Sequence, residues 1–229
     1  MALHSINPAT GELLESFIEH TPGEAAALVA RAHEAQASWS RVGIPERAAV
    51  LSRAAAVLRA EKAPLARLMS EEMGKPVLQA VAEVEKCALA CEHYAANGAA
   101  MLAPERIAAD AVASYVRFDP LGVILAVMPW NFPLWQVFRF AAPALLAGNA
   151  CLLKHASGVT RCALRIEEVW RRAGLLPGLF AVLRLGSARV EELVAHPLVR
   201  AVTLTGSDAA GRAVAAVAGR QLKKVVLEL

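Results

Sequence analysis

Apolar residues recur at every third or fourth position from residue 22 to about residue 98, in a stretch rich in Ala, Glu and Arg. This spacing puts the apolar side chains on one helical face and predicts three amphipathic helices. The Gly-Lys-Pro sequence at 74–76 separates the second predicted helix from the third, because glycine and proline interrupt helices. The clearest apolar positions are Ala48, Leu51, Ala55 and Leu58, followed by Leu65, Leu68 and Met69.

From about residue 113 the pattern changes to short apolar runs separated by helical segments. Helices are expected to begin near Phe132, Val159, Ala188 and Asp208. Strands that alternate with helices in this way predict β-α-β units and a doubly wound α/β domain with a parallel sheet. The apolar runs are VASYVRF (112–118), GVILAVM (122–128), ACLLK (150–154), FAVLRL (180–185), AVTLTG (201–206) and VVLEL (225–229).

The first and last of these runs differ from the others. Residues 112–118 alternate polar and apolar side chains just before Pro120, which favours an antiparallel hairpin over a sheet interior. The last run is apolar enough for a central strand, yet the sequence stops within it. We therefore expect the chain to be a fragment or one part of a split protein.

Composition narrows the class of protein. Apolar residues make up 56% of the 229 residues, enough for a substantial core, and the net charge of +3 is spread without runs of one sign. Neither a nucleic-acid partner nor a membrane partner is expected, and a cytoplasmic protein is the default. The four cysteines form no paired metal-binding or disulfide pattern, so we expect buried or half-buried thiols and no metal. They are Cys87, Cys91, Cys151 and Cys162.

The most specific stretch is PLGVILAVMPWNFPLWQVFRFAAPALLAGNACLLKHAS, residues 120–157. With NPATGE at 7–12, EMGKP at 72–76, TGSDAAGR at 205–212 and LKKVVLEL at 222–229, it resembles the aldehyde dehydrogenase superfamily over essentially the whole chain. The resemblance implies a truncated aldehyde dehydrogenase fold: a Rossmann-like NAD(P)-binding domain at 1–229, with part of an oligomerisation hairpin at about 102–120. It also implies a homo-oligomer in the full-length family and a catalytic domain outside this sequence.

Two polar residues carry the chemistry that the resemblance implies. Asn131 follows a predicted strand, where open α/β sheets place ligand groups, and it corresponds to the asparagine that holds the developing oxyanion of the aldehyde. Glu228 lies in an apolar strand, so it must be paired, hydrogen-bonded or neutral, and it matches the general base of the family's LELGG motif. The alternatives are a helix cap at Asn131 and a solvent-facing edge-strand carboxylate at Glu228.

The resemblance also assigns a dinucleotide site. Lys154 corresponds to the lysine that reaches the adenosine ribose. Ser157 stands where many NAD-preferring members have a glutamate, so NADP should be tolerated or preferred. Gly206 and Ser207 lie at a strand-to-helix junction, where backbone amides favour a pyrophosphate. The Met128, Pro129 and Trp130 backbone completes the implied cofactor contacts. A solvated lysine and an ordinary capped helix are the alternatives.

Arg139 lies eight residues after Asn131, near the middle of a predicted helix. With PLWQVFR and LLKHA, it resembles the bacterial succinate-semialdehyde dehydrogenases, in which an arginine binds the distal carboxylate of the substrate. A surface arginine is the alternative. The family attacks the aldehyde with a cysteine a few tens of residues beyond the LELGG motif, and none of the four cysteines stands in that context.

Three functional hypotheses follow. The first is an NAD(P)-dependent aldehyde dehydrogenase, with succinate semialdehyde as the expected substrate, of which this chain is an N-terminal part that is inactive alone. The second is a dinucleotide-binding module, complemented by a separate C-terminal polypeptide. The third is a non-catalytic assembly or regulatory subunit, for which the sequence offers no specific feature.

Overall fold

A computed structural model describes residues 2–229, and its core is a parallel five-stranded sheet. The strand order is β7-β6-β5-β8-β9, and every neighbouring pair is parallel, as the alternating pattern predicts. The central strands are apolar because both faces of the sheet are covered. The strands are β5 (Val123–Met128), β6 (Ala150–His155), β7 (Phe180–Val182), β8 (Val199–Thr205) and β9 (Lys224–Glu228).

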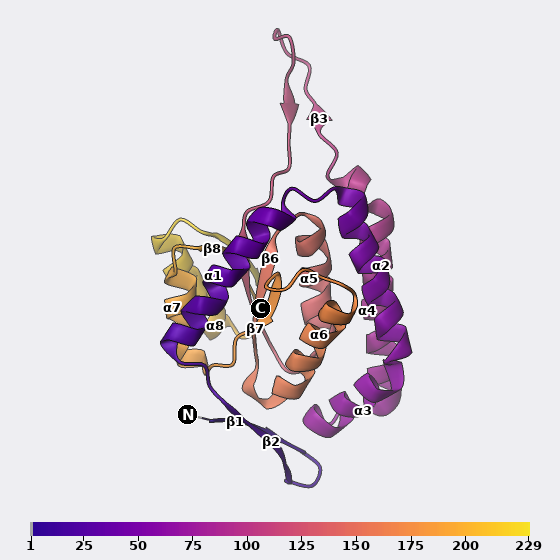
Figure 1. Cartoon of the computed structure of the whole chain (residues 1–229). Helices are drawn as coiled ribbons and strands as arrows, with labels where there is room; N and C mark the ends of the chain where they lie inside the picture. Colours follow the sequence, from indigo (N-terminus) through magenta and orange to yellow (C-terminus); the bar gives the residue numbers. More distant parts are fainter. Residues whose placement is uncertain (1) are drawn as a thin grey trace.

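Helices cover both faces of the sheet, so the predicted doubly wound architecture is confirmed (Figure 1). On one face, α5 (Trp135–Leu146) and α6 (Thr160–Arg172) lie between the sheet and the N-terminal helices. The opposite face carries α7 (Val190–Ala195) and α8 (Asp208–Arg220), and α1 also contacts the sheet. Short 3₁₀ turns, η1 (Ser157–Val159) and η2 (Ser187–Arg189), precede α6 and α7.

The last apolar run forms strand β9, as expected. Strand β9 lies at the sheet edge, paired only with β8 among residues 2–229. Its side chains alternate between exposed and partly covered, and Val226 is 55% exposed. An apolar run identifies a strand but does not say whether both of its neighbours are present.

The N-terminal half forms four helices rather than the three predicted; the last three pack together as a helical layer, and the first lies against the sheet (Figure 1). They are α1 (Pro22–Trp39), α2 (Ile44–Ala60), α3 (Lys62–Met73) and α4 (Val77–Met101). The extra break falls at Glu61, whose carboxylate receives hydrogen bonds from Arg165 and Arg172 of α6. The break between α3 and α4 falls at the predicted Gly-Lys-Pro, where Gly74 has a positive φ of 75°.

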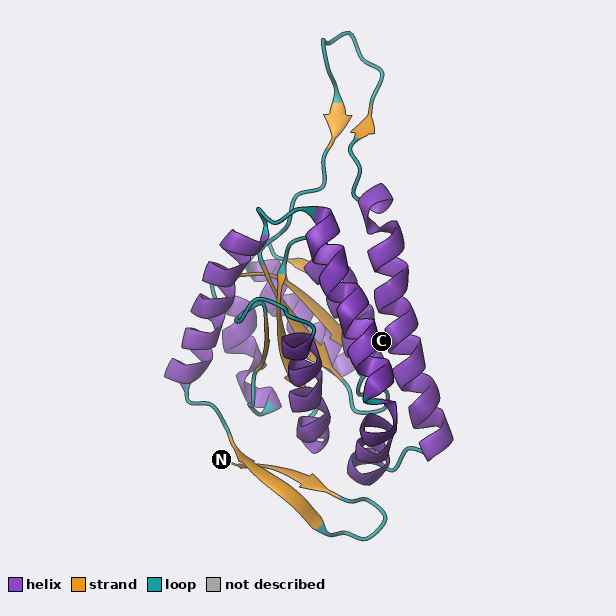
Figure 2. Cartoon of the chain, turned by 45° about the vertical axis from the view of Figure 1, so that its right-hand side comes forward, coloured by secondary structure: helices purple, strands orange, loops and turns teal. Residues whose placement is uncertain are grey.

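Two hairpins project from this body (Figure 2). The expected hairpin is confirmed as β3 (Glu105–Arg106) paired antiparallel with β4 (Tyr115–Val116), although its strands are shorter than the predicted run. A second hairpin, β1 (Ala2–Ile6) with β2 (Leu13–Ile18), was not predicted. Its residues mix polar and apolar types too briefly to give a clear period.

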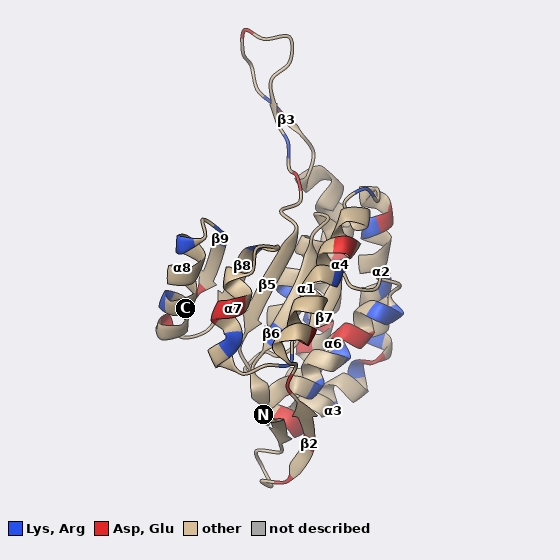
Figure 3. Ribbon diagram, turned by 60° about the vertical axis from the view of Figure 1, so that its left-hand side comes forward, with Lys and Arg blue, Asp and Glu red and all other residues tan. Residues whose placement is uncertain are grey.

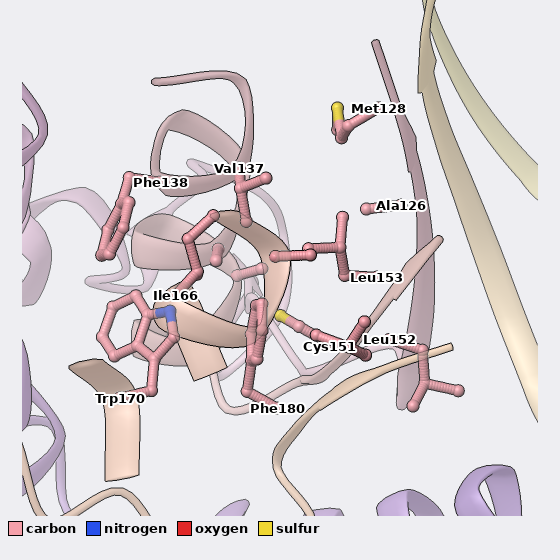
Figure 4. Close-up of a cluster of buried hydrophobic side chains, with 14 of the residues drawn as sticks. Ala126, Met128, Val137, Phe138, Cys151, Leu152, Leu153, Ile166, Trp170 and Phe180 are labelled. Carbon is pink, nitrogen blue, oxygen red and sulfur yellow. The ribbon is translucent and has the colours of Figure 1, made fainter. Parts of the chain in front are cut away.

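The core between α5, α6 and the sheet is built around aromatic side chains (Figure 4). Phe138 stacks on Trp170 with ring centroids 5.2 Å apart, and Phe180 lies 6.3 Å from Trp170. Phe138 and Trp170 are fully buried. This cluster fixes α5 and α6 against the sheet, so the strand ends and the helix starts have defined positions.

Ionic side chains of both signs are interspersed over the helices (Figure 3). Within the described residues no helix has the length and apolar character needed to cross a membrane. The same residues contain no cluster of three or more His, Cys, Asp or Glu side chains suited to a metal ion.

Candidate functional site

The site lies at the carboxyl edge of the sheet, where β5, β6, β8 and β9 all end. The register aligns Met128 with His155 across β5 and β6, and Thr205 with Glu228 across β8 and β9. Because parallel strands end at one edge, the residues that follow them are brought to the same side of the molecule. This edge therefore collects the predicted residues from four separate parts of the sequence.

Asn131 lies in the turn between β5 and α5, as expected. Its Oδ1 accepts a hydrogen bond from the Phe132 amide at 3.1 Å, and its side chain is exposed. Helix α5 begins at Trp135, with Leu134 at the N-cap position, so Asn131 is not the cap of this helix. The carboxamide NH₂ forms no hydrogen bond within residues 2–229, which leaves a donor available at the sheet edge.

The residues flanking Asn131 have different exposures. Met128 ends β5 and is buried at 3% exposure, whereas Trp130 is 58% exposed. Pro129 lies between them and is half-buried. The Trp130 side chain therefore lies at the surface, whereas Met128 packs in the core.

A buried ion pair between Lys75 and Glu83 contacts the N-terminus of α5. Glu83 of α4 accepts hydrogen bonds through Oε1 from the backbone amides of Leu134 and Trp135, both at 2.9 Å. Lys75 pairs with the other oxygen of the same carboxylate. The Lys75 ammonium also lies 3.8 Å from the ring centroid of Phe132. A carboxylate at a helix N-terminus satisfies otherwise unpaired amides and favours the helix dipole.

A buried histidine at the end of β6 forms a hydrogen bond with the same turn. His155, the last residue of β6, bonds through Nε2 to the Pro133 carbonyl at 2.8 Å, and its Nδ1 accepts from the Ala156 amide at 2.9 Å. The two bonds require a neutral ring with its proton on Nε2. Burial lowers the pKa of His155 to about 4, which keeps the ring neutral near pH 7.

Glu228 is paired, as its setting in the strand required, but it is not buried. Arg139 of α5 donates to both of its carboxylate oxygens, with Nη1 2.9 Å from Oε1. Thr205 donates its hydroxyl to Oε2 at 3.1 Å, and Gln136 accepts from Arg139 at 2.6 Å. The Glu228 side chain is 52% exposed at the open edge of β9. The structure thus joins a predicted base to a predicted substrate-binding residue.

This pair lies on the wall of an apolar groove of about 510 Å³ on the α5 face of the sheet. Met128, Phe140 and Val226 also line it. Its polar lining consists of Arg139, Lys224, Glu228 and two threonines, so the groove suits a small, mostly apolar molecule with an anionic end.

A second cavity, of about 320 Å³, lies on the other face, between the sheet and helices α7 and α8. Lys154 from β6 lines it and is only 6% exposed. Burial lowers the pKa of Lys154, an effect that Glu19 partly opposes. Among the described residues its ammonium takes part in no ion pair. An unpaired ammonium facing a cavity is suited to ligand hydroxyl or phosphate oxygens, so the donor set fits a dinucleotide.

The predicted cofactor residues Ser157, Gly206 and Ser207 follow β6 and β8 but do not themselves line this cavity. Ser157 begins η1 and is half-buried. Ser207 is the N-cap of α8, and its Oγ accepts from the Ala210 amide at 3.4 Å. The Gly206 amide donates to the Glu228 carbonyl at 3.0 Å, so this predicted phosphate donor is already used within the sheet. The exposed first turn of α8 remains the available anion-binding feature.

All four cysteines are buried free thiols, as predicted. Burial raises the pKa of Cys91 to about 12 and raises that of the other three as well. A cysteine nucleophile needs its thiolate, so none of these thiols is suited to attack an aldehyde. None lines either cavity described above.

Sequence reasoning missed Lys75, Glu83 and His155. A signal existed for Glu83, which lies on the apolar stripe of α4 between Ala80 and Cys87, where a surface glutamate is not expected. Lys75 belongs to the EMGKP motif, whose function the sequence left open. Nothing local distinguishes His155, because its partner Pro133 lies 22 residues away in the sequence.

Comparisons with known proteins match the whole chain. Residues 1–229 match the model of the aldehyde dehydrogenase family. The chain is 49% identical over 229 residues to a probable NADP(+) succinate-semialdehyde dehydrogenase of Synechocystis sp., and 48% identical over 232 residues to NADP(+) succinate-semialdehyde dehydrogenase 1 of Mycobacterium tuberculosis. These alignments cover 100% of this chain and 50% and 51% of the relatives, so the chain spans about half of their length.

Solved structures give the same result. The crystal structure of succinic semialdehyde dehydrogenase from Streptococcus pyogenes in complex with NADP+ aligns with a TM-score of 0.96 at 36% identity. This alignment covers 99% of the present chain and 50% of that one. The structure of Gox0499 aligns with a TM-score of 0.98 at 36% identity, over 100% of this chain and 50% of its own.

Proposed function

This chain belongs to the aldehyde dehydrogenase family, and on that premise we propose that it supplies the dinucleotide site and part of the catalytic site for NAD(P)-dependent oxidation of an aldehyde to a carboxylic acid. The observation that carries the proposal is the convergence of Asn131, Lys154, Glu228 and the start of α8 on one edge of the sheet. Two cavities flank that edge on opposite faces.

We assign the cavity beside Lys154 to the adenosine end of the cofactor. The buried ammonium would donate to ribose hydroxyl or phosphate oxygens, and the exposed first turn of α8 would favour the pyrophosphate. The NADP(+) named for the relatives and the serine at position 157 both support NADP as an accepted cofactor. When bound, the nicotinamide accepts hydride from the substrate carbon.

The chain's own residues would act on the aldehyde and on the water that releases the acid. Asn131 would donate its NH₂ to the aldehyde oxygen as negative charge develops there, a contact whose loss commonly costs about 100-fold to 1,000-fold in kcat. Glu228 would hold and remove a proton from the water that releases the acid. In this structure its carboxylate is held by Arg139, so it must leave that pair to act as a base.

The nucleophile has to come from outside these four cysteines, whose thiols are buried and protonated. We therefore infer that this chain alone does not oxidise aldehydes. A second candidate, a dinucleotide-binding module without chemistry of its own, is favoured by the same observation, because the Lys154 cavity does not depend on the nucleophile.

Succinate semialdehyde is the substrate that we propose. The apolar groove is lined by two cationic side chains, Arg139 on α5 and Lys224 at the start of β9, and the relatives are named for this substrate. The test is kcat/KM for succinate semialdehyde and butanal in an active enzyme that contains this chain, with and without Arg139→Ala. The substitution should lower the value for succinate semialdehyde at least about tenfold more than that for butanal, since a charge-assisted pair is lost only for the former. Equal losses in kcat/KM for the two aldehydes would contradict a carboxylate-binding role of Arg139, and the substrate would then be an aldehyde of unspecified kind.

Cofactor binding has a separate test, which needs no catalysis. The purified chain is titrated with NADPH and NADH by fluorescence, and the Lys154→Met variant serves as the matched comparison because methionine keeps most of the lysine stem. We expect NADPH binding that Lys154→Met weakens by about tenfold or more. No binding by the folded chain would contradict the assignment of this cavity.

A further inference from the structure

Three buried polar side chains from three different elements converge on residues 132–135, directly after Asn131. They are Lys75 from the α3–α4 connection, Glu83 from α4 and His155 from β6, here called the turn cluster. Their exposures are 7%, 4% and 5%, respectively. None of them enters the function proposed above.

The turn cluster contacts every residue of this short segment. The Phe132 ring lies under the Lys75 ammonium, and the Pro133 carbonyl bonds to His155. The next two backbone amides donate to Glu83, and Lys75 closes the network by pairing with the same carboxylate. Buried polar groups that are fully satisfied in this way fix one geometry, because any displacement leaves a desolvated group unpaired.

Asn131, by contrast, has little to hold it. Its side chain is exposed, and its one hydrogen bond goes to the amide of its own neighbour Phe132. The direction of the carboxamide is therefore set by the backbone that carries it. Oxyanion donors act by being oriented before charge develops, and a displacement of about 1 Å can cost about 100-fold in rate.

We propose that the turn cluster preorganises the Asn131 carboxamide, so that Lys75, Glu83 and His155 are positioning residues for the oxyanion donor. The proposal rests on the proposed function, in which Asn131 is that donor. It adds residues of the helical layer, which touch neither cavity, to the determinants of the reaction.

Glu72 provides a matched control for Glu83, because it makes the same kind of helix cap at a different helix. Glu72 of α3 is likewise buried, at 3% exposure, and its carboxylate accepts from the Arg161 and Cys162 amides at the start of α6, both at 2.8 Å. Glu72 also accepts from Ser5 at 2.7 Å and makes no contact with the Asn131 turn. Replacing it removes an equivalent helix cap in a different place.

The first experiment uses this chain and needs no activity. Glu83→Gln and Glu72→Gln are compared with the unmodified chain by NMR, through backbone amide exchange and the side-chain NH₂ resonances of Asn131. We expect Glu83→Gln to speed exchange at Leu134 and Trp135 by about tenfold or more and to shift the Asn131 resonances. Glu72→Gln should speed exchange only at the start of α6.

Unchanged Asn131 resonances in a folded Glu83→Gln variant would overturn the proposal, as would equal changes in both variants. His155→Ala, which removes the bond to the Pro133 carbonyl together with the bond from the Ala156 amide, carries the same test if Glu83→Gln does not fold.

The second experiment measures kcat and KM in an active enzyme that contains this chain. Glu83→Gln and His155→Ala should lower kcat by about 10-fold to 100-fold while KM for NADP+ stays unchanged, and Glu72→Gln should leave kcat close to normal. His155→Gln should recover much of the loss, because its amide can donate to the Pro133 carbonyl.

The two experiments separate the two proposals. If the enzyme oxidises no aldehyde, the proposed function fails, and the NMR comparison still decides whether the turn cluster orients Asn131. If it oxidises aldehydes and Glu83→Gln keeps normal kcat, the turn cluster proposal fails and the proposed function stands.

Discussion

Arg139 of α5 and Glu228 of β9 form a two-pronged ion pair, with Nη1 of the arginine 2.9 Å from Oε1 of the glutamate and Nη2 bonded to Oε2. Their side chains are 37% and 52% exposed, so water reaches the pair from the open edge of β9. Both side chains line the apolar groove of about 510 Å³. A ligand carboxylate that reaches Arg139 must therefore compete with Glu228.

This competition makes a prediction for succinate, which carries the carboxylate of the proposed substrate without its aldehyde. Glu228→Gln should strengthen succinate binding to the chain severalfold, because the guanidinium loses its charged partner. Titration followed by NMR at the Arg139 side chain measures this. The double variant Arg139→Ala with Glu228→Gln should lose the gain, and equal succinate affinity in Glu228→Gln and the unmodified chain would argue against a carboxylate site at Arg139.

A second prediction concerns cofactor choice. Ser157→Glu introduces a carboxylate at the start of η1, where it would repel the 2'-phosphate of NADPH and accept from the ribose hydroxyls of NADH. The ratio of NADPH to NADH affinity should fall by about tenfold or more. Ser157→Gln, which adds similar volume without charge, is the control. The same fall in the control would assign the effect to size rather than to charge.

A third prediction follows from the buried thiols. The chain alone should form no NADPH from NADP+ and succinate semialdehyde, and its four cysteines should react with a thiol reagent at least about 100-fold faster in denaturant than in the folded state. Aldehyde-dependent NADPH formation that disappears in Glu228→Gln would contradict the inferred inactivity.

A fourth prediction concerns pH. The unfolded chain protonates His155 below its ordinary pKa of 6.5, whereas the folded chain resists protonation until about pH 4. The stabilisation is complete above pH 6.5 and is lost as the pH falls towards 4, so His155 should make the chain about 2 kcal/mol less stable at pH 5 than at pH 7. Urea unfolding at the two pH values measures this. His155→Gln should remove that part of the difference, and an equal pH dependence in the variant would exclude His155 as its source.

A fifth prediction concerns association, which we propose through the β3–β4 hairpin. Val112 and Tyr115 are strongly exposed there, with 108% and 56% exposure. Apolar side chains on a projecting hairpin favour contact with a second chain. Sedimentation at micromolar concentration should detect dimers or larger species, and Tyr115→Lys with Val112→Glu should reduce them. A monomer throughout would speak against this role of the hairpin.

The sheet was predictable from the sequence where strands are covered on both faces. Strand β5 is wholly apolar, and β6 and β8 are largely apolar, because helices lie on both faces of the sheet. The break at Glu61 was not visible, because the arginines that hold it lie on α6, 104 and 111 residues away in the sequence. The spacing of apolar residues in a segment indicates which of its side chains are buried. It does not indicate which residues from another layer will contact that segment.

The candidate site likewise has a part that the sequence predicts and a part that it does not. Asn131, Lys154 and Glu228 are predicted as site residues from motifs, and their common edge follows from the parallel strands. The pairing of Glu228 with Arg139 was not predictable, since it joins residues 89 positions apart. The Gly206 amide was expected to be free for phosphate, yet the arrival of β9 beside β8 uses it for the sheet.

The helical layer meets the sheet layer through Glu72 and Glu83, each of which caps a helix packed on the sheet. Separating the layers would break the hydrogen bonds of two carboxylates with four amides and leave the starts of α5 and α6 without these acceptors. Neither layer can then loosen by itself at low free-energy cost. We therefore expect the α/β sheet and the helices that carry Glu72 and Glu83 to unfold together, as one cooperative unit.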